Sequence, residues 1–276
     1  MLQVSEILQC PVCATSINQL LECPICGEKY VVMNDVYLMV NKKLSHKEWK
    51  WDQSVFTEEK MRSQKEKYQS YLNEETKNAQ IIWWAEMNRE IGVFKGIVGD
   101  LATGLGGMFE RLMRAESEFT PIATDVDPNV LAWTTKTMKA EYKKEFISVA
   151  TDGKHFAFQD DTFNIITSCA GLNNIPNTRA VISELYRTLK KDGMLTLMHS
   201  FIDSNSASYK LAKEYNVERP FVKQLLIEDL SKAGFKNVTA KIVSSAIWAG
   251  NPMDGLPAAN DMQYYAIIIN KGSTSF

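Results

Sequence analysis

Apolar and polar residues follow two different periodicities from residue 94 onward. Short apolar runs predict seven strands, at 94–101, 119–125, 145–150, 163–169, 194–200, 237–246 and 262–270. Apolar residues recur at helical spacing over 108–115, 128–142, 178–190 and 221–233. Strands that alternate with helices predict an α/β fold, here a doubly wound, mostly parallel seven-stranded sheet.

The N-terminal part of the chain, residues 1–41, carries two C-x-x-C pairs. Nine residues separate the pairs, which consist of Cys10, Cys13, Cys23 and Cys26. Each pair turns tightly enough for two thiolates to converge, so the four cysteines predict a closed, structural Zn²⁺ site. Disulfides or free thiols are the alternative. An apolar hairpin turning at Asn34-Asp35 follows. We therefore expect a zinc ribbon, stabilised by its metal because so short a segment has little core.

Residues 42–93 are polar and are predicted to be helical. Their first half is charged, and aromatic residues follow around Trp83-Trp84. In one interpretation, aromatic residues such as Trp49 and Trp51 stack nucleic-acid bases beside a basic groove. In the other, the segment is a helical lid that packs on the next domain, because several acids dilute its positive charge. The predicted domains are a zinc ribbon (1–41), a helical linker or lid (42–93) and the sheet domain (94–276).

The composition is that of an ordinary soluble globular protein. Hydrophobic residues make up 45% and charged residues 23% of the 276 residues, and the net charge is −2. No overall field therefore attracts nucleic acid or an anionic membrane. The N-terminus lacks a basic segment followed by an apolar one, and no apolar run approaches the roughly 20 residues that span a bilayer. We expect a cytoplasmic protein without a membrane span.

The first predicted strand of the sheet domain ends in an acid and a turn of small residues. Asp100 closes the strand, Gly104 and Gly106 follow, and a helical pattern begins at Met108. Small residues let a ligand approach the backbone, and a helix N-terminus offers free N–H groups. Asp125, at the end of the next strand, has the spacing of an acid that binds ribose hydroxyls. These residues predict a nucleotide-type ligand.

Two common nucleotide sites do not fit this turn. A dinucleotide site needs a small residue at the third position after Gly106, where Phe109 stands. The acid ahead of the glycines is not part of that fingerprint either. The G-x-x-x-x-G-K-[ST] pattern of a phosphate loop is absent from the sequence.

The run Asp100-Leu-Ala-Thr-Gly-Leu-Gly-Gly107 resembles the first motif of class I S-adenosylmethionine-dependent methyltransferases. The resemblance continues in order at 123–128, 151–166, 168–174, 184–193 and 230–235, and it covers about residues 90–272. It implies a Rossmann-like methyltransferase fold, with Asp125 on the ribose and Asp152 on the adenine. The cofactor-binding residues that it implies are Asp100, Ala102, Thr103, Gly104, Gly106, Asp125, Val126, Asp127, Asp152, Gly153 and Cys169.

Ala102 departs from this motif, which usually has glycine at that position. Alanine is small but does not easily adopt a positive φ. We therefore expect the loop to turn differently or to bind the cofactor more weakly.

Candidate catalytic residues are few. Methyl transfer is an in-line displacement that depends mainly on positioning, and a base is required only if the acceptor keeps its proton. His199, at a predicted strand end, is a candidate base or acceptor-orienting group, and the alternative is a hydrogen-bonded wall residue. Asn173 is the second candidate.

The acceptor is indicated by two further resemblances. The segment 170–175 resembles quinone-biosynthesis C-methyltransferases and their type 11 relatives, which implies a small-molecule acceptor. The ribbon resembles zinc modules of methyltransferase activating subunits and of ribosomal RNA methyltransferases, which keeps an RNA acceptor open. A non-catalytic zinc-ribbon interaction protein on a methyltransferase scaffold is the third alternative. We expect a methyltransferase acting on a small molecule, and a homodimer is compatible with the sequence.

Overall fold

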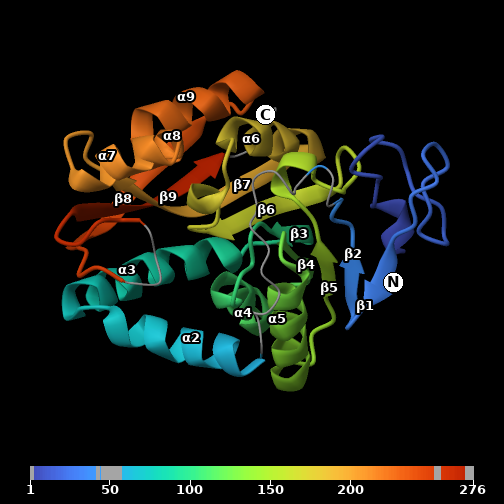
Figure 1. The fold of residues 1–276 in the computed structure, drawn as a ribbon, viewed down its shortest axis with the longest axis horizontal. Coiled ribbons are helices and arrows are strands. Elements are labelled where there is room, and N and C mark those ends of the chain that lie inside the picture. Colours follow the sequence, from blue (N-terminus) through green and yellow to red (C-terminus); the bar gives the residue numbers. More distant parts are fainter. Residues whose placement is uncertain (1–2, 42–43, 45–57, 252–255, 271–276) are drawn as a thin grey trace.

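The computed structural model describes residues 3–41, 44, 58–251 and 256–270. Its strands form one sheet with the order β1-β2-β5-β4-β3-β6-β7-β9-β8 (Figure 1). The strands are β1 (Val31–Met33), β2 (Val36–Leu38), β3 (Gly96–Asp100), β4 (Phe119–Asp125), β5 (Ile147–Ala150), β6 (Phe163–Cys169), β7 (Leu189–Ile202), β8 (Val238–Ile247) and β9 (Met262–Asn270). The pairs among β2 to β7 are parallel, and β9 runs antiparallel to both β7 and β8.

The predicted fold class is confirmed, but the predicted number of strands is wrong: the sheet has nine strands, not seven. The two additional strands come from the N-terminal ribbon. Strand β2 pairs in parallel with β5, where Tyr37 lies opposite Val149. The hairpin turns at Asn34 and Asp35 as predicted, and both residues have a positive φ, 52 and 61°, as a type I′ turn requires. The ribbon therefore extends the edge of the sheet.

Helices cover both faces of the sheet (Figure 1). On one face lie α3 (Glu74–Ile91), α4 (Gly107–Arg114) and α5 (Pro128–Glu141), and on the other α6 (Thr178–Thr188), α8 (Glu218–Phe221) and α9 (Lys223–Ala233). Each face has its own apolar core. Leu112 and Leu131 belong to the first core, Leu185 and Leu230 to the second.

Helix α5 begins where its sequence predicts. The carboxylate of Asp127 accepts hydrogen bonds from the backbone N–H groups of Asn129 (2.8 Å) and Val130 (3.2 Å). Pro128 occupies the first helical position, where its missing N–H costs nothing. This cap fixes the direction in which the chain leaves β4, just beyond Asp125, the candidate residue for binding the ribose.

The ribbon is also joined to the chain beyond β5. Leu8 forms an antiparallel bridge with Phe158, and the N–H of Gln9 donates to the carbonyl of Ala157 at 3.0 Å. The Leu8 side chain is fully buried in the same core as Phe156 and Phe158. The ribbon therefore packs directly on the segment that follows β5.

The linker is helical in the part that the structure describes. Helix α2 (Glu58–Tyr71) precedes α3, which packs against β8 and β9. The Asn73 side chain caps α3 at the N–H of Thr76 and donates to the carbonyl of Ile247. The Trp49 and Trp51 of the proposed base-stacking surface lie outside the described residues. None of the helices in the described ranges combines the length and apolarity that a membrane crossing requires.

Candidate active site

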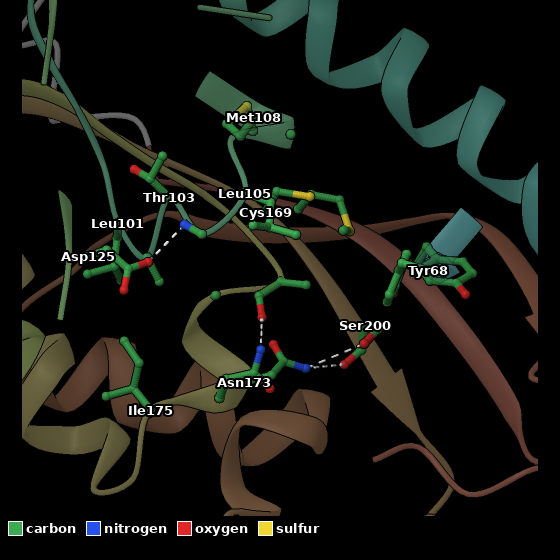
Figure 2. A pocket seen from close by; sticks show the side chains of 18 of the residues that line it. Tyr68, Leu101, Thr103, Leu105, Met108, Asp125, Cys169, Asn173, Ile175 and Ser200 are labelled. Carbon is green, nitrogen blue, oxygen red and sulfur yellow. Dashed lines mark hydrogen bonds between the residues drawn. The ribbon is translucent and has the colours of Figure 1, made fainter. Parts of the chain in front are cut away.

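A cavity of about 640 Å³ opens at the carboxyl ends of the parallel strands (Figure 2). It lies where the strand order reverses between β3 and β6, the position at which doubly wound folds bind ligands. One end of the cavity, here called the turn end, is lined by the loop after β3 and the ends of β4 and β5. The other, the aromatic end, is lined by Trp83, Trp84, Phe221, Trp248 and Tyr265.

Asp125 ties the small-residue turn to the end of β4. One carboxylate oxygen accepts the N–H of Gly104 at 2.8 Å (Figure 2), and the other accepts the N–H of Asp127 at 3.0 Å. Burial raises the pKa of Asp125, and these two bonds oppose that rise. A carboxylate has about four acceptor positions, so this one keeps two for a ligand. Two free acceptor positions at the wall of the cavity suit a pair of vicinal hydroxyls.

The turn has the left-handed conformation that glycine favours, including at Ala102. The φ angle of Ala102 is 53°, the same value as at Gly104. Ala102 therefore adopts the positive φ that glycine usually supplies, and of the two expected consequences the weaker binding of the cofactor stays a prediction. Ala170, which also lines the cavity, has a positive φ of 55° as well. Such strain in non-glycine residues concentrates at functional sites because surrounding contacts must hold it in place.

Replacing Ala102 with glycine is expected to stabilise the protein by about 0.5 kcal/mol, because relief of the left-handed strain outweighs glycine's greater entropy when unfolded. Urea unfolding at equilibrium measures this free energy. The matched control is Gly104→Ala, which adds a Cβ at the same φ with only the Ala102 carbonyl 3.9 Å away. It is expected to lose stability, and a loss in Ala102→Gly as well would contradict the strain argument.

Asp100 lies beneath the turn and is 1% exposed. Its backbone carbonyl accepts bonds from the Thr103 and Thr124 hydroxyls, but neither carboxyl oxygen has a hydrogen-bond partner among the described residues. Burial, with a smaller effect from the charge of Asp125, raises the pKa of Asp100 to about 8. A carboxyl group without a partner beside a cavity fits a ligand that carries positive charge.

The Asp100→Asn variant is expected to remove part of the pH dependence of stability. Because the folded-state pKa of about 8 exceeds the unfolded value of about 3.9, this group stabilises the protein most below pH 4. That contribution is lost as the pH rises through 8. Asp100→Asn should therefore unfold at a higher temperature than the wild type at pH 8.5, with little difference at pH 4.

Calorimetric scans of both proteins across this pH range provide the test, with Asp192→Asn on an exposed position of β7 as the control. A wild-type advantage at pH 8.5 would show that Asp100 is stabilised as a carboxylate.

The segment after β5 closes the turn end. Thr151 and Gly153 line the cavity. The Asp152 carboxylate accepts the N–H of Lys154 at 2.9 Å and lies 3.6 Å from its ammonium group, with both side chains buried. Asp152 is thus held under the surface of the cavity by its own helical turn.

The predicted cofactor residues therefore converge, although not all of them line the cavity. Those that line it are Ala102, Thr103, Gly104, Asp125, Val126, Gly153 and Cys169. Those that support it from behind are Asp100, Gly106, Asp127 and Asp152. Burial raises the pKa of the Cys169 thiol, which makes it a neutral wall residue and not a nucleophile.

Asn173 lies between the two ends of the cavity (Figure 2). Its amide nitrogen donates to the Ser200 carbonyl and hydroxyl at 3.3 and 3.4 Å. Its buried amide oxygen has no partner in the described part of the chain, and the same is true of Trp248 Nε1 and Gln263 Nε2. Unpaired polar atoms in a cavity wall are costly unless a ligand pairs with them. The aromatic end of the cavity wall therefore contains polar side chains among its aromatic rings.

His199 does not line the cavity, although its neighbours in β7 do. Side chains alternate between the faces of a strand, so Met198 and Ser200 face the cavity and His199 points to the other side. There its Nε2 lies 2.5 Å from the carbonyl oxygen of Pro220. Burial lowers the pKa of His199 to about 4, so the ring is neutral. This placement favours the wall-residue alternative over the base.

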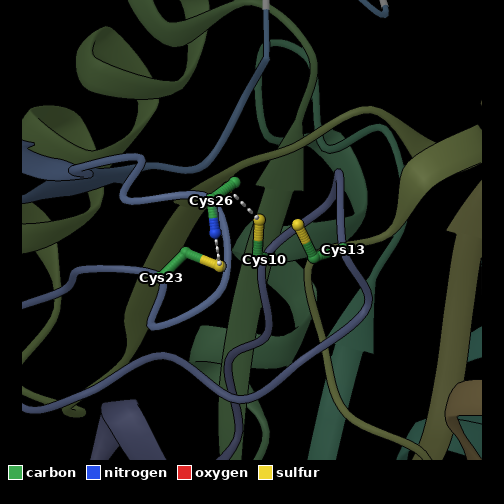
Figure 3. Close-up of side chains that lie close together, drawn as sticks. All are labelled: Cys10, Cys13, Cys23 and Cys26. Carbon is green, nitrogen blue, oxygen red and sulfur yellow. Dashed lines mark hydrogen bonds between the residues drawn. The ribbon is translucent and has the colours of Figure 1, made fainter.

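The four cysteines of the ribbon converge (Figure 3). Their sulfur atoms lie within 4.8 Å of one another, and the Sγ atoms of Cys10 and Cys26 are 3.8 Å apart. Two thiolates on a tetrahedral Zn²⁺ ion with bonds of about 2.3 Å are separated by about 3.8 Å. The arrangement therefore fits a zinc ion.

A family model of the ubiE/COQ5 methyltransferases matches residues 25–235, which is more than half of the chain. The chain belongs to the ubiE/COQ5 methyltransferase family. The match begins after the first three cysteines of the ribbon, so Cys10, Cys13 and Cys23 lie outside the part that this family defines.

Curated relatives carry names that agree with the ubiE/COQ5 family. The demethylmenaquinone methyltransferase of Corynebacterium urealyticum is 30% identical over 117 residues, 42% of this chain and 47% of that protein. The corresponding enzyme of Lactobacillus johnsonii is 29% identical over 85 residues, 30% and 35% of the two chains. The matched segments thus span less than half of these relatives.

Solved structures support the fold of the ubiE/COQ5 chain. A Haemonchus contortus phosphoethanolamine N-methyltransferase in complex with S-adenosylhomocysteine superposes with a TM-score of 0.57 at 13% identity, covering 80% of this chain and 59% of that chain. The YcgJ protein from Bacillus subtilis gives a TM-score of 0.52 at 14% identity, covering 67% and 95%. At these identities the likeness concerns the fold alone.

Sequence reasoning missed part of the site of this ubiE/COQ5 chain. Phe221, Trp248 and Gln263 carry no motif, because they come from a four-residue helix and from the ends of β8 and β9. The RNA alternative depended on the ribbon and on the linker, of which Trp49 and Trp51 lie outside the described ranges, and the family match does not favour it.

Proposed function

We propose that this chain transfers a methyl group from S-adenosylmethionine to a carbon atom of a small, hydroxylated aromatic molecule of the quinol type. The observation that carries the proposal is the single cavity that joins the turn end to the aromatic end. The names of the curated relatives support the acceptor class, since they are demethylmenaquinone methyltransferases.

The turn end fits the methyl donor. The two free acceptor positions of Asp125 suit the ribose hydroxyls, and the unpartnered carboxyl group of Asp100 suits a cationic ligand. Thr151 and Gly153 are available for the adenine. No lysine or third glycine is needed, because this ligand has no phosphate. When bound, it supplies an activated methyl group on a sulfonium.

The aromatic end fits the acceptor. Its rings can stack on a flat aromatic molecule and exclude water. The cavity wall also includes Asn173, Trp248 and Gln263, whose side chains each carry a buried polar atom without a partner among the described residues. Burial raises the pKa of Tyr265 to about 12, so its hydroxyl is no base at neutral pH. The acceptor must therefore be electron-rich by itself, as a hydroquinone ring is, and the site acts mainly by positioning.

Incubation of the protein with deuterium-labelled S-adenosylmethionine and reduced demethylmenaquinone tests the proposal. Mass spectrometry is expected to find one labelled methyl group on the ring. A protein that binds S-adenosylhomocysteine in calorimetry yet methylates no hydroxylated aromatic compound would contradict the acceptor class. A protein that binds neither ligand would contradict the whole proposal.

We further propose that the ribbon holds a structural zinc ion through Cys10, Cys13, Cys23 and Cys26. The fit of the sulfur positions to a tetrahedral ion supports this. Four protein ligands leave no open position, so this metal would stabilise the fold and not take part in catalysis.

A further inference from the structure

The four-residue helix α8 forms part of the cavity wall and is anchored by ionic contacts to α9. Arg219 donates two hydrogen bonds to the carboxylate of Asp229, at 2.6 and 2.7 Å. Asp229 is 4% exposed and also accepts a bond from Arg179 of α6 at 3.0 Å. Arg219, the second residue of α8, is thus fixed from one side.

The next residue of α8 is fixed from the other side by the sheet. The carbonyl oxygen of Pro220 can only accept a hydrogen bond, so the Nε2 atom of His199, 2.5 Å away, carries the proton. The histidine side chain is fully buried, and its Nδ1 has no partner among the residues that the structure describes. His199 therefore acts as a fixed donor to the backbone of α8.

The fourth and last residue of α8, Phe221, reaches the cavity. It lines the aromatic end and is 3% exposed. It packs with Ile202 and Ala212 in a small apolar cluster that is separate from the two main cores, and Leu256 lies against this cluster and also lines the cavity. So small a cluster gives limited support, and the position of Phe221 depends strongly on its two anchored neighbours.

We infer that His199 is a positioning residue for the acceptor: through Pro220 it holds Phe221 in the wall of the aromatic end and so sets how tightly the acceptor ring is bound. The inference rests on the proposed function, because it assigns the aromatic end to the acceptor. It predicts that His199 affects the acceptor more than the methyl donor, since Phe221 belongs to α8 and not to the turn after β3 that Asp125 holds.

The test compares His199→Leu, which removes the donor, with His199→Gln, whose amide nitrogen can take the place of Nε2. For His199→Leu, the KM for reduced demethylmenaquinone is expected to rise about tenfold, as for loss of one buried hydrogen bond, with a smaller change in kcat. The Kd for S-adenosylhomocysteine, from calorimetry, should stay within about twofold. His199→Gln should recover most of the acceptor affinity, which a purely space-filling role of His199 would not allow.

A double-mutant cycle with Phe221→Ala shows whether His199 acts through Phe221. The double variant His199→Leu, Phe221→Ala should have the same KM as Phe221→Ala alone. Once the Phe221 ring has been removed, loss of the His199 hydrogen bond can no longer displace it. If His199→Leu does not fold, Arg219→Ala takes its place, since it loosens the same turn from a partly exposed position.

Three outcomes would overturn the inference: additive effects in the cycle, no recovery in His199→Gln, or equal losses for donor and acceptor. Quenching of the cavity tryptophans by 1,4-naphthoquinone measures binding without turnover. A wild type that neither binds this probe nor methylates the quinol disproves the proposed function. An active wild type whose variants show no acceptor effect disproves this inference alone.

Discussion

Replacing Asp125 with alanine is expected to weaken the binding of S-adenosylhomocysteine by about 100- to 1,000-fold. The carboxylate has two acceptor positions free for the ribose, and each hydrogen bond to a charged group contributes about 1.5–3 kcal/mol. Its loss also frees the N–H of Gly104, which removes one of the hydrogen bonds that hold the turn in place. Isothermal titration calorimetry of the purified variant measures the affinity directly.

The isosteric Asp125→Asn is the matched control for this prediction. It keeps one carbonyl oxygen for the N–H of Gly104 but loses the charge and one acceptor, so its affinity should lie between those of the wild type and the alanine variant. Thermal unfolding without ligand separates a damaged fold from a damaged site. If Asp125→Ala keeps its affinity within about threefold while remaining folded, the ribose role is disproved.

Removal of the metal from the ribbon is expected to lower the stability of the whole protein by several kcal/mol. Structural zinc contributes a large free energy to small modules, and here the module also supplies two strands to the sheet and Leu8 to its core. Cys10→Ser should give the same result, because Cys10 directly follows the residue that bonds to Ala157. Elemental analysis measures the zinc, and scanning calorimetry the unfolding.

The same treatment should also weaken cofactor binding. Ala157 donates its N–H to the Thr151 hydroxyl at 3.0 Å, and Thr151 lines the turn end of the cavity. Loosening the ribbon therefore frees one wall of that end. The control is Asp192→Asn at an exposed position of β7, outside both the cysteine cluster and the cavity lining, which should keep its zinc and its cofactor affinity. Protein purified without chelators that contains no zinc, or a Cys10→Ser variant as stable as the wild type, would contradict the structural role.

Local patterns predicted most of the sheet domain. The strand Phe163–Cys169 agrees with its prediction to the residue, because an apolar run is bounded on both sides by turn-forming residues. The helix predicted to begin at Pro128 does so because cap and proline coincide. The pairing of β2 with β5 left no local signal, since it joins segments far apart in the chain whose apolar patterns are each compatible with several partners.

The sequence predicted which acids lie near the candidate site. It did not predict the backbone conformation or the side-chain directions around them. The motif order brought Asp100 and Asp125 together, but nothing in the sequence predicted that Ala102 would adopt a left-handed φ. The sequence predicted that His199 lies at a strand end, but not that Met198 and Ser200 would line the cavity while His199 lies on the other face. Helix α8 is too short to have a period, so its wall residue Phe221 could be found only in three dimensions.

The parallel pairing of β2 with β5 also has a consequence for the order in which the chain is made. The ribbon leaves the ribosome first, but the strand on which it docks is synthesised much later. During that interval the hairpin has an unpaired edge and three exposed apolar residues in β1, Val31, Val32 and Met33. If the ribbon binds its metal early, the ion would hold the four cysteines together and keep the hairpin folded until β5 has been synthesised. With the proposed zinc site, zinc supply during translation would then be a factor in the yield of folded protein.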